Sequence, residues 1–180
     1  MLTQHRIPVS LSLLSFDLPV WSMVETDATL YQKDQDTFHV LLTEPVITDP
    51  VQPTPTDSLE DWAIRLPEAV RPSAQPQPTP RLLWLELSPY RVIMTMQGNG
   101  QFSYRHYWEQ GVYGVSRYWL QTPDLSRNQI RLRNFTRHLK LEGQTLPHHL
   151  RVEYELWTQN LQLGHYVLNL EIHHPDVFDE

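Results

Sequence analysis

The chain has 180 residues, a formal net charge of −7, 40% hydrophobic and 19% charged residues, and no Cys. This length fits one domain, or one domain with an appended arm, and the composition is that of a globular chain rather than a disordered one. The lack of Cys excludes disulfides, thiolate nucleophiles and Cys-ligated zinc or iron–sulfur sites. No stretch has the pattern of a secretion signal or of a membrane-spanning helix, so we expect a soluble, cytoplasmic protein.

Charge is distributed unevenly along the sequence. Residues 1–80 have a net charge of −7, residues 81–151 of +6, and residues 152–180 of −6. The basic middle can neutralise the acidic parts across a sheet, or it can present a positively charged patch to an anionic partner.

The first 48 residues predict three or four short strands of the β domain. Apolar and β-branched residues gather at 6–16, 18–24 and 37–42, with polar turn residues between them. Residues 49–80 differ, because eight of these 32 positions are proline. Proline at this density prevents ladder formation, so the segment is predicted to be a linker or a long excursion.

One short helix is expected inside this Pro-rich excursion, at residues 58–66. Asp57 and Glu60 have the spacing of a capping box, and Trp62 and Leu66 share one helical face. The helix can fold back on the parent sheet as a lid, or it can serve as a tethered docking motif for another protein.

From residue 81 to residue 174 the pattern predicts the main antiparallel meander, with about six long strands. Candidate strands lie at 81–87, 91–96, 102–108, 112–121 and 130–141, followed by a hairpin at 150–172 and a loose tail at 175–180. We therefore predict a mainly-β fold whose meander closes into a calycin-like barrel; the alternative is a two-sheet β-sandwich.

The C-terminal hairpin has the most specific pattern. A two-residue turn at Gln159 and Asn160 keeps Leu150, Val152, Tyr154 and Leu156 on one face. The second strand keeps its apolar residues on that face only if the register shifts by one residue, and we predict a β-bulge at Gly164 and His165. The bulge places Leu163 opposite Leu156, Tyr166 opposite Tyr154, Leu168 opposite Val152 and Leu170 opposite Leu150. A second bulge is expected near Arg133 and Asn134, which turns Phe135, Leu139 and Leu141 to the same side.

Arginine alternates with aromatic residues through the basic segment, and Lys is scarce. The guanidinium fork suits bidentate pairing with carboxylates, which indicates a protein partner or a carboxylated ligand. Nucleic acid is an unlikely partner, because the chain as a whole is acidic. The residues predicted to bind a partner or ligand are Trp62, Leu66, Arg105, Trp108, Arg117, Tyr118, Trp119, Arg131, Arg133 and Arg137.

Two functions follow from this pattern. The first is a non-catalytic β-module that binds another protein, as an accessory or assembly factor of a larger complex. The alternative is a barrel that binds or processes an apolar carboxylated ligand, such as a tetrapyrrole or a lipid. In that case Trp84, Trp108, Tyr118 and Trp119 line an interior cavity, and Arg105 or Arg117 holds the carboxylates.

The sequence predicts no catalytic residues and no bound metal. It lacks phosphate-binding loops, serine-hydrolase elbows and zinc-protease motifs. A weaker candidate for zinc or nickel is a group of four histidines at one end of the C-terminal hairpin: His148, His149, His173 and His174. The alternative for this group is a solvent-exposed, polar strand end without a metal.

The Trp-, Gln- and Pro-rich, Cys-free composition resembles that of small cyanobacterial accessory proteins, some of which are calycin-like barrels that handle bilins. The resemblance rests on composition alone and transfers no residue role.

Overall fold

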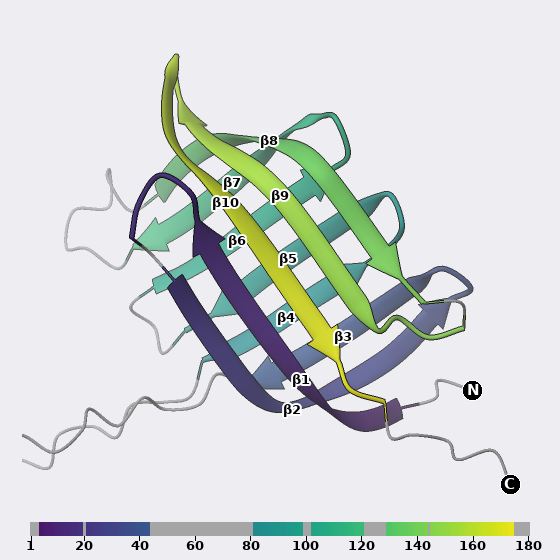
Figure 1. Ribbon diagram of the computed structural model, residues 1–180. Coiled ribbons are helices and arrows are strands. Elements are labelled where there is room, and N and C mark those ends of the chain that lie inside the picture. The colour runs from purple at the N-terminus through teal and green to yellow at the C-terminus, as the bar shows by residue number, and fades with distance from the viewer. Residues whose placement is uncertain are drawn as a thin grey trace, which may run out of the picture.

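A closed barrel of ten antiparallel strands makes up the protein in its computed structural model, which describes residues 4–19, 21–43, 81–98, 102–120, 129–143 and 145–174. Each strand pairs with the strands before and after it in the chain, and β10 returns to pair with β1, so the described sheet has no free edge (Figure 1). The predicted mainly-β barrel is thereby confirmed, and the sandwich alternative is wrong.

The strands run as follows: β1 Gln4–Ser15, β2 Trp21–Asp34, β3 Thr37–Thr43, β4 Leu82–Leu87, β5 Arg91–Gln97, β6 Phe102–Glu109, β7 Tyr113–Leu120, β8 Gln129–Glu142, β9 His149–Thr158 and β10 Leu161–Ile172.

The N-terminal strands and the later meander belong to the same barrel. β3 pairs with β4, and β1 pairs with β10 and β2. β1 and β2 have 12 and 14 residues and are therefore not the short strands that we predicted. The helix expected at residues 58–66, with Trp62 and Leu66, lies outside the described residues, as does the tail at 175–180.

The hairpin of β9 and β10 has the predicted change of register. Tyr154 pairs with Tyr166, and the two predicted pairs that follow it along the ladder are also present. The shift falls between Gln162 and Gly164, so Leu156 pairs with Gly164 rather than with Leu163. In the turn, Gln159 has the positive φ of 50°. The turn was placed correctly, but the bulge begins one residue earlier than we predicted.

The irregularity of β8 lies further along the strand than expected. The register against β9 shifts between Thr136 and His138, not near Arg133. Asn134 and Thr136 therefore point into the barrel, where both have no exposed surface, and Phe135 points outward. The prediction for Phe135 was wrong because it assumed that only apolar side chains face inward.

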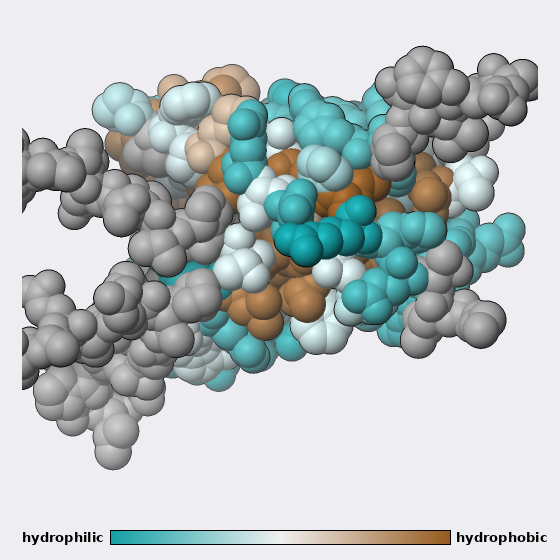
Figure 2. Space-filling view, turned by 90° about the horizontal axis from the view of Figure 1, so that it is seen from below, coloured by the Kyte–Doolittle hydropathy of each residue, from teal (hydrophilic) through white to brown (hydrophobic). Residues whose placement is uncertain are grey.

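The barrel interior is filled mainly by aliphatic residues that alternate with outward polar residues along each strand. Leu85, Leu87, Val92, Leu150 and Leu170 have no exposed surface. On the face seen from below, hydrophilic side chains dominate and hydrophobic ones show between them (Figure 2). Within the described residues no helix is long and apolar enough to cross a membrane.

Candidate functional site

Three arginines lie side by side on the outside of the barrel. Arg105 on β6 pairs in register with Arg117 on β7, and Arg117 pairs with Arg131 on β8. All three side chains are exposed. Like charges opposite each other on one sheet face repel, so this row lowers the stability of the sheet.

Aromatic and aliphatic side chains complete the same outer surface. The ring of Tyr113 contacts that of Phe135 at 4.9 Å between centroids, and the guanidinium carbon of Arg133 lies 5.4 Å from the centroid of the Tyr113 ring. An open groove of about 460 Å³ on this surface is lined by Tyr113, Arg105 and Arg117, among other residues. We call this surface the arginine–aromatic face; it comprises Arg105, Tyr107, Tyr113, Val115, Arg117, Arg131, Arg133 and Phe135.

Among the described residues, no carboxylate pairs with the four arginines of this face. Arg131 is hydrogen-bonded to the Gln129 side chain at 3.1 Å, and Arg133 donates to the carbonyl of Gln159. The nearby Glu109 accepts a hydrogen bond from the Tyr107 hydroxyl, which raises the pKa of Tyr107. Four other arginines of the barrel do have carboxylate partners: Arg6 with Asp27, Arg91 with Glu86, Arg137 with Glu155, and Arg151 with Glu153.

A polar network lies on the inner side of the same strands. The His106 Nδ1 atom lies 2.8 Å from the Ser116 hydroxyl, which also accepts a hydrogen bond of 2.8 Å from the Asn134 amide. His106 stacks on Trp108 with 4.9 Å between ring centroids. Burial lowers the pKa of His106 to about 3, so the imidazole is neutral at physiological pH.

The strands pack closely around Gly114, beside this network. A Cβ atom at Gly114 would lie 2.7 Å from the Asn134 Oδ1 atom and 2.2 Å from the carbonyl oxygen of Tyr107. Ser116 and His106 have the separation of a nucleophile and its base, but Ser116 has no exposed surface. We therefore assign the network to the core rather than to catalysis. Three buried polar atoms near it have no hydrogen-bond partner among the described residues: Trp108 Nε1, Asn134 Oδ1 and Thr136 Oγ1.

The aromatic residues predicted to line the interior divide between the two sides of the barrel. Trp108 is fully buried inside, and Tyr118 faces inward 5.4 Å from the His106 ring, where burial raises its pKa above the usual range. Trp84 is 48% exposed on the outside, and Trp119 shares the outer face of β7 with Arg117. Trp84 and Trp119 therefore do not line the interior as the ligand hypothesis required.

The predicted arginines share the outer surface, but not one environment. Arg105 and Arg117 point away from the barrel interior, so neither side chain reaches a ligand inside the barrel. Arg137 differs from the rest of the group, because it forms an ion pair with the buried Glu155, whose other oxygen accepts a hydrogen bond from Trp157. Arg137 is thus part of the charge pairing of the β8–β9 wall.

The four histidines at the end of the last hairpin contact three different partners. His148 and His149 lie within 4.0 Å of Glu142, His173 is hydrogen-bonded to Ser10, and His174 contacts the carbonyl of Pro147. His149 and Glu171 are paired in register. The described part of the chain contains no group of three or more His, Cys, Asp or Glu residues placed to hold a metal ion.

Two further features were not found from the sequence. One is an exposed apolar patch on the β1–β2 hairpin, with Leu14 opposite Trp21 and Phe16 against the His165 ring. The other is a cavity of about 110 Å³ inside the barrel, at the end where the β1–β2 turn lies. Its lining draws on six or more strands, so no local pattern reveals it.

Comparison with protein-family models gives no match, and no curated protein matches either. Among solved structures, the crystal structure of the ywiB protein from Bacillus subtilis is similar, with a TM-score of 0.55, 10% sequence identity and 96% of each chain covered. At this identity the likeness shows the barrel fold alone.

Proposed function

We propose that this protein is a non-catalytic β-module that binds another protein through its arginine–aromatic face, as an accessory factor of a larger complex. The observation that carries the proposal is the row of Arg105, Arg117 and Arg131 on adjacent strands, with no carboxylate partner among the described residues. A protein keeps repelling charges on one face at a cost in stability, and binding offers a reason to retain them.

The chemistry of the face favours an acidic protein surface as its partner. A guanidinium group pairs with a carboxylate through two parallel hydrogen bonds, and Arg, Tyr and Phe are enriched in protein interfaces. Tyr113, Val115 and Phe135 provide apolar area between the charges. The chain has a net charge of −7, so it lacks the general positive field that steers proteins to nucleic acid.

The face also has a depression in which a side chain of the partner can anchor. Its open groove is lined by Arg105, Arg117 and Gly114, among other residues. Most of the free energy of a protein interface comes from a few side chains that fill such depressions. We expect a partner to place an apolar or aromatic side chain there, with carboxylates on either side.

The test compares two triple variants of the full-length protein. One carries Arg105→Gln, Arg117→Gln and Arg131→Gln; the control removes the same charge elsewhere by Arg6→Gln, Lys33→Gln and Lys140→Gln, all at exposed positions. A partner is captured from native extract, identified, purified and titrated against each variant. We expect the first triple variant to bind at least about tenfold more weakly than the wild type, and the control to bind like the wild type.

Equal loss of binding in both triple variants would reduce the effect to net charge and overturn the proposal. The proposal also fails if a single-stranded oligonucleotide binds the face more tightly than the purified protein partner does.

A further inference from the structure

Two arginines of the arginine–aromatic face border the same groove. Arg105 on β6 lies directly opposite Arg117 on β7, and both line the open groove of about 460 Å³. The Cβ atoms of residues paired in this way are roughly 5 Å apart. Within the described part of the chain, neither side chain forms an ion pair or a hydrogen bond. Two guanidinium groups without a described partner therefore border one small volume.

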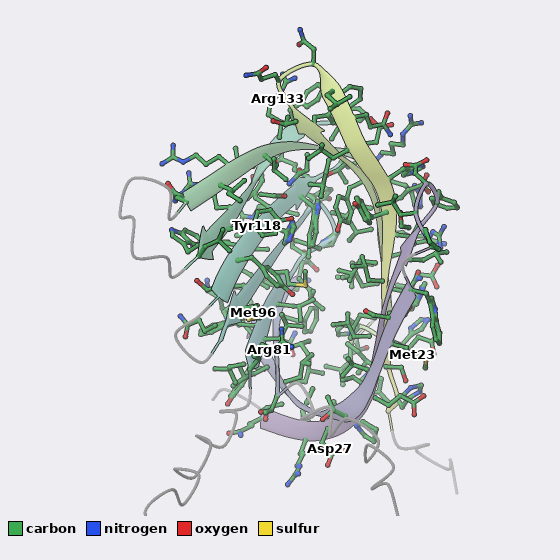
Figure 3. All side chains as sticks on the ribbon, turned by 90° about the vertical axis from the view of Figure 1, so that its left-hand side faces the viewer. Met23, Asp27, Arg81, Met96, Tyr118 and Arg133 are labelled. Carbon is green, nitrogen blue, oxygen red and sulfur yellow. The ribbon has the colours of Figure 1, made fainter. Side chains whose placement is uncertain are left out.

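The other two arginines of the face differ from this pair. The Arg131 guanidinium donates a hydrogen bond of 3.1 Å to the Gln129 side chain, and neither of these residues lines the groove. Arg133 donates to the carbonyl of Gln159 and lies at the end of the barrel that carries the β9–β10 turn (Figure 3). The open capacity of the face to bind an anion is thus concentrated at the groove.

The spacing of the groove arginines suits a phosphate group better than carboxylates. A carboxylate carries one negative charge, and its oxygens are used by a single guanidinium fork, so the neighbouring arginine keeps its charge unpaired. Two carboxylates side by side would pair both arginines but would repel each other at this distance. A phosphate monoester carries a charge of roughly −1.5 to −2 at neutral pH and has three acceptor oxygens, so one group can neutralise both guanidiniums.

The rest of the groove lining suits an aromatic carrier of that phosphate. Tyr113 and Val115 are 57% and 40% exposed, and the Tyr107 ring belongs to the same lining. A bound aromatic ring would cover this apolar surface and stack against the tyrosines. Phosphoserine has no apolar group that could do the same.

We propose that the groove binds a phosphotyrosine side chain of the protein partner. The ring packs against Tyr113 and Val115, and the phosphate accepts hydrogen bonds from Arg105 and Arg117, all of which line the groove. This inference rests on the proposed function, because it uses the same face and specifies the side chain that fills its groove. Carboxylates elsewhere on the partner remain free to pair with Arg131.

Fluorescence anisotropy with short labelled peptides tests the proposal on the full-length protein. The probe is a peptide of alanine and glycine with one phosphotyrosine at its centre, and the matched peptides carry tyrosine, glutamate or phosphoserine at that position. We expect the phosphotyrosine peptide to bind at least about tenfold more tightly than each of the other three. Inorganic phosphate should displace it only at concentrations at least about tenfold above those of the unlabelled phosphotyrosine peptide.

The dependence on pH separates a phosphate from a carboxylate. The second pKa of a phosphate monoester is about 6, so the dianion forms between pH 5 and pH 7 while arginine stays protonated. The affinity of the phosphotyrosine peptide should therefore rise by up to about tenfold across this range. The glutamate peptide, which is largely ionised throughout, should show little change and controls for groups of the protein that titrate there.

Two variants locate the phosphate. Arg105→Gln and Arg117→Gln should each reduce the phosphotyrosine peptide to the affinity of the tyrosine peptide. Arg6→Gln, the same change on β1 and away from the groove, should leave the affinity unchanged. All three positions are exposed, so the variants should fold, and thermal unfolding checks this.

Any one of four results overturns the proposal. These are equal binding of the phosphotyrosine peptide and its tyrosine or glutamate counterpart, equal binding of the phosphoserine peptide or of inorganic phosphate, full affinity in both groove variants, and tighter binding of a single-stranded oligonucleotide than of the phosphotyrosine peptide.

Failure of this inference can be told apart from failure of the proposed function. If the peptides give a negative result while the purified partner protein still loses affinity in the arginine triple variant, only the phosphotyrosine inference is wrong. If the partner protein binds the triple variant like the wild type, the proposed function is wrong and this inference falls with it.

Discussion

Two neighbouring walls of the barrel differ in the polarity of their inner side and in the pairing of their outer charges. In the wall formed by β9 and β10, the inner side is apolar, with Leu150, Val152 and Leu170, and the outer Glu153 carboxylate has partners in Arg151 and in the His165 ring, at 2.9 Å. In the wall formed by β6, β7 and β8, the inner side holds a polar network, and the outer side holds Arg105, Arg117, Arg131 and Arg133, which have no carboxylate partner in the described part of the chain.

The apolar interior and paired outer groups of the β9–β10 wall favour stability. The inner polar network and the arginines without carboxylate partners in the β6–β8 wall lower it. Natural sequences depart from consistent packing and charge pairing mainly where function requires it. Because the departures occur on both sides of the same three strands, these strands are the place to look for function. The comparison can be tested on each side of the wall.

The largest effect is expected from the inner network as the pH falls. The folded state holds the pKa of His106 at about 3, below the value of 6.5 for a free histidine, so the unfolded chain binds the proton more tightly. The contribution of neutral His106 to the free energy of unfolding is therefore fully present above about pH 6.5. It decreases toward pH 3, by up to about 1.4 kcal/mol per pH unit. Urea unfolding between pH 4 and pH 7 measures this slope.

The variant His106→Gln supplies the comparison for that slope. Its amide keeps a hydrogen bond within reach of Ser116 but does not titrate in this range. We expect a lower overall stability with a flatter dependence on pH. Identical slopes in the wild type and the variant would show that the network does not differ from the apolar wall in this respect.

A smaller effect separates the paired arginines from the unpaired ones. Arg137→Gln leaves the Glu155 carboxylate, which is 4% exposed, without its charged partner. We expect a loss of about 2 kcal/mol in the free energy of unfolding, below the full cost of breaking a buried pair because Arg137 is itself half exposed and Trp157 still donates to Glu155. Arg131→Gln, the same change on the same strand, should cost less than about 0.5 kcal/mol. Equal losses would contradict the distinction between paired and unpaired arginines.

The smallest effect has the opposite sign. Arg117 lies between two other arginines, so Arg117→Gln should stabilise the protein by a few tenths of a kcal/mol at low salt. The gain should disappear at about 1 M salt, where charges are screened within roughly 3 Å. Thermal unfolding of the wild type and the variant at both salt concentrations measures it. A destabilised variant at low salt would mean that Arg117 is favourably paired in solution.

The sequence predicted the hairpin of β9 and β10 best. Its apolar residues repeat every second position, and a shift of one residue would expose them all, so the register was constrained by the pattern. Prediction failed on β8, where Asn134 and Thr136 face inward. Polar residues in a core depend on partners from other strands, here Ser116 on β7, and such partners are not visible within one strand's pattern.

The candidate site was predicted in part for the same reason. The alternation of Arg105, Arg117, Arg131 and Arg133 with aromatic residues indicated a charged face, and the structure places all four outside. The sequence pattern could not show that Arg137 has a buried partner in Glu155, because that contact joins two strands. The sequence also could not show the cavity inside the barrel, or that Arg81 lines it, because the lining comes from several strands.

The sequence by itself determined that this chain forms antiparallel strands and which residues of most strands face the core, because side-chain alternation is a local property of an extended backbone. Only the tertiary structure decided which arginines are neutralised, which polar groups lie in the interior, and where space remains. Those properties depend on distances between strands far apart in the chain, and closure of the barrel between β1 and β10 sets them.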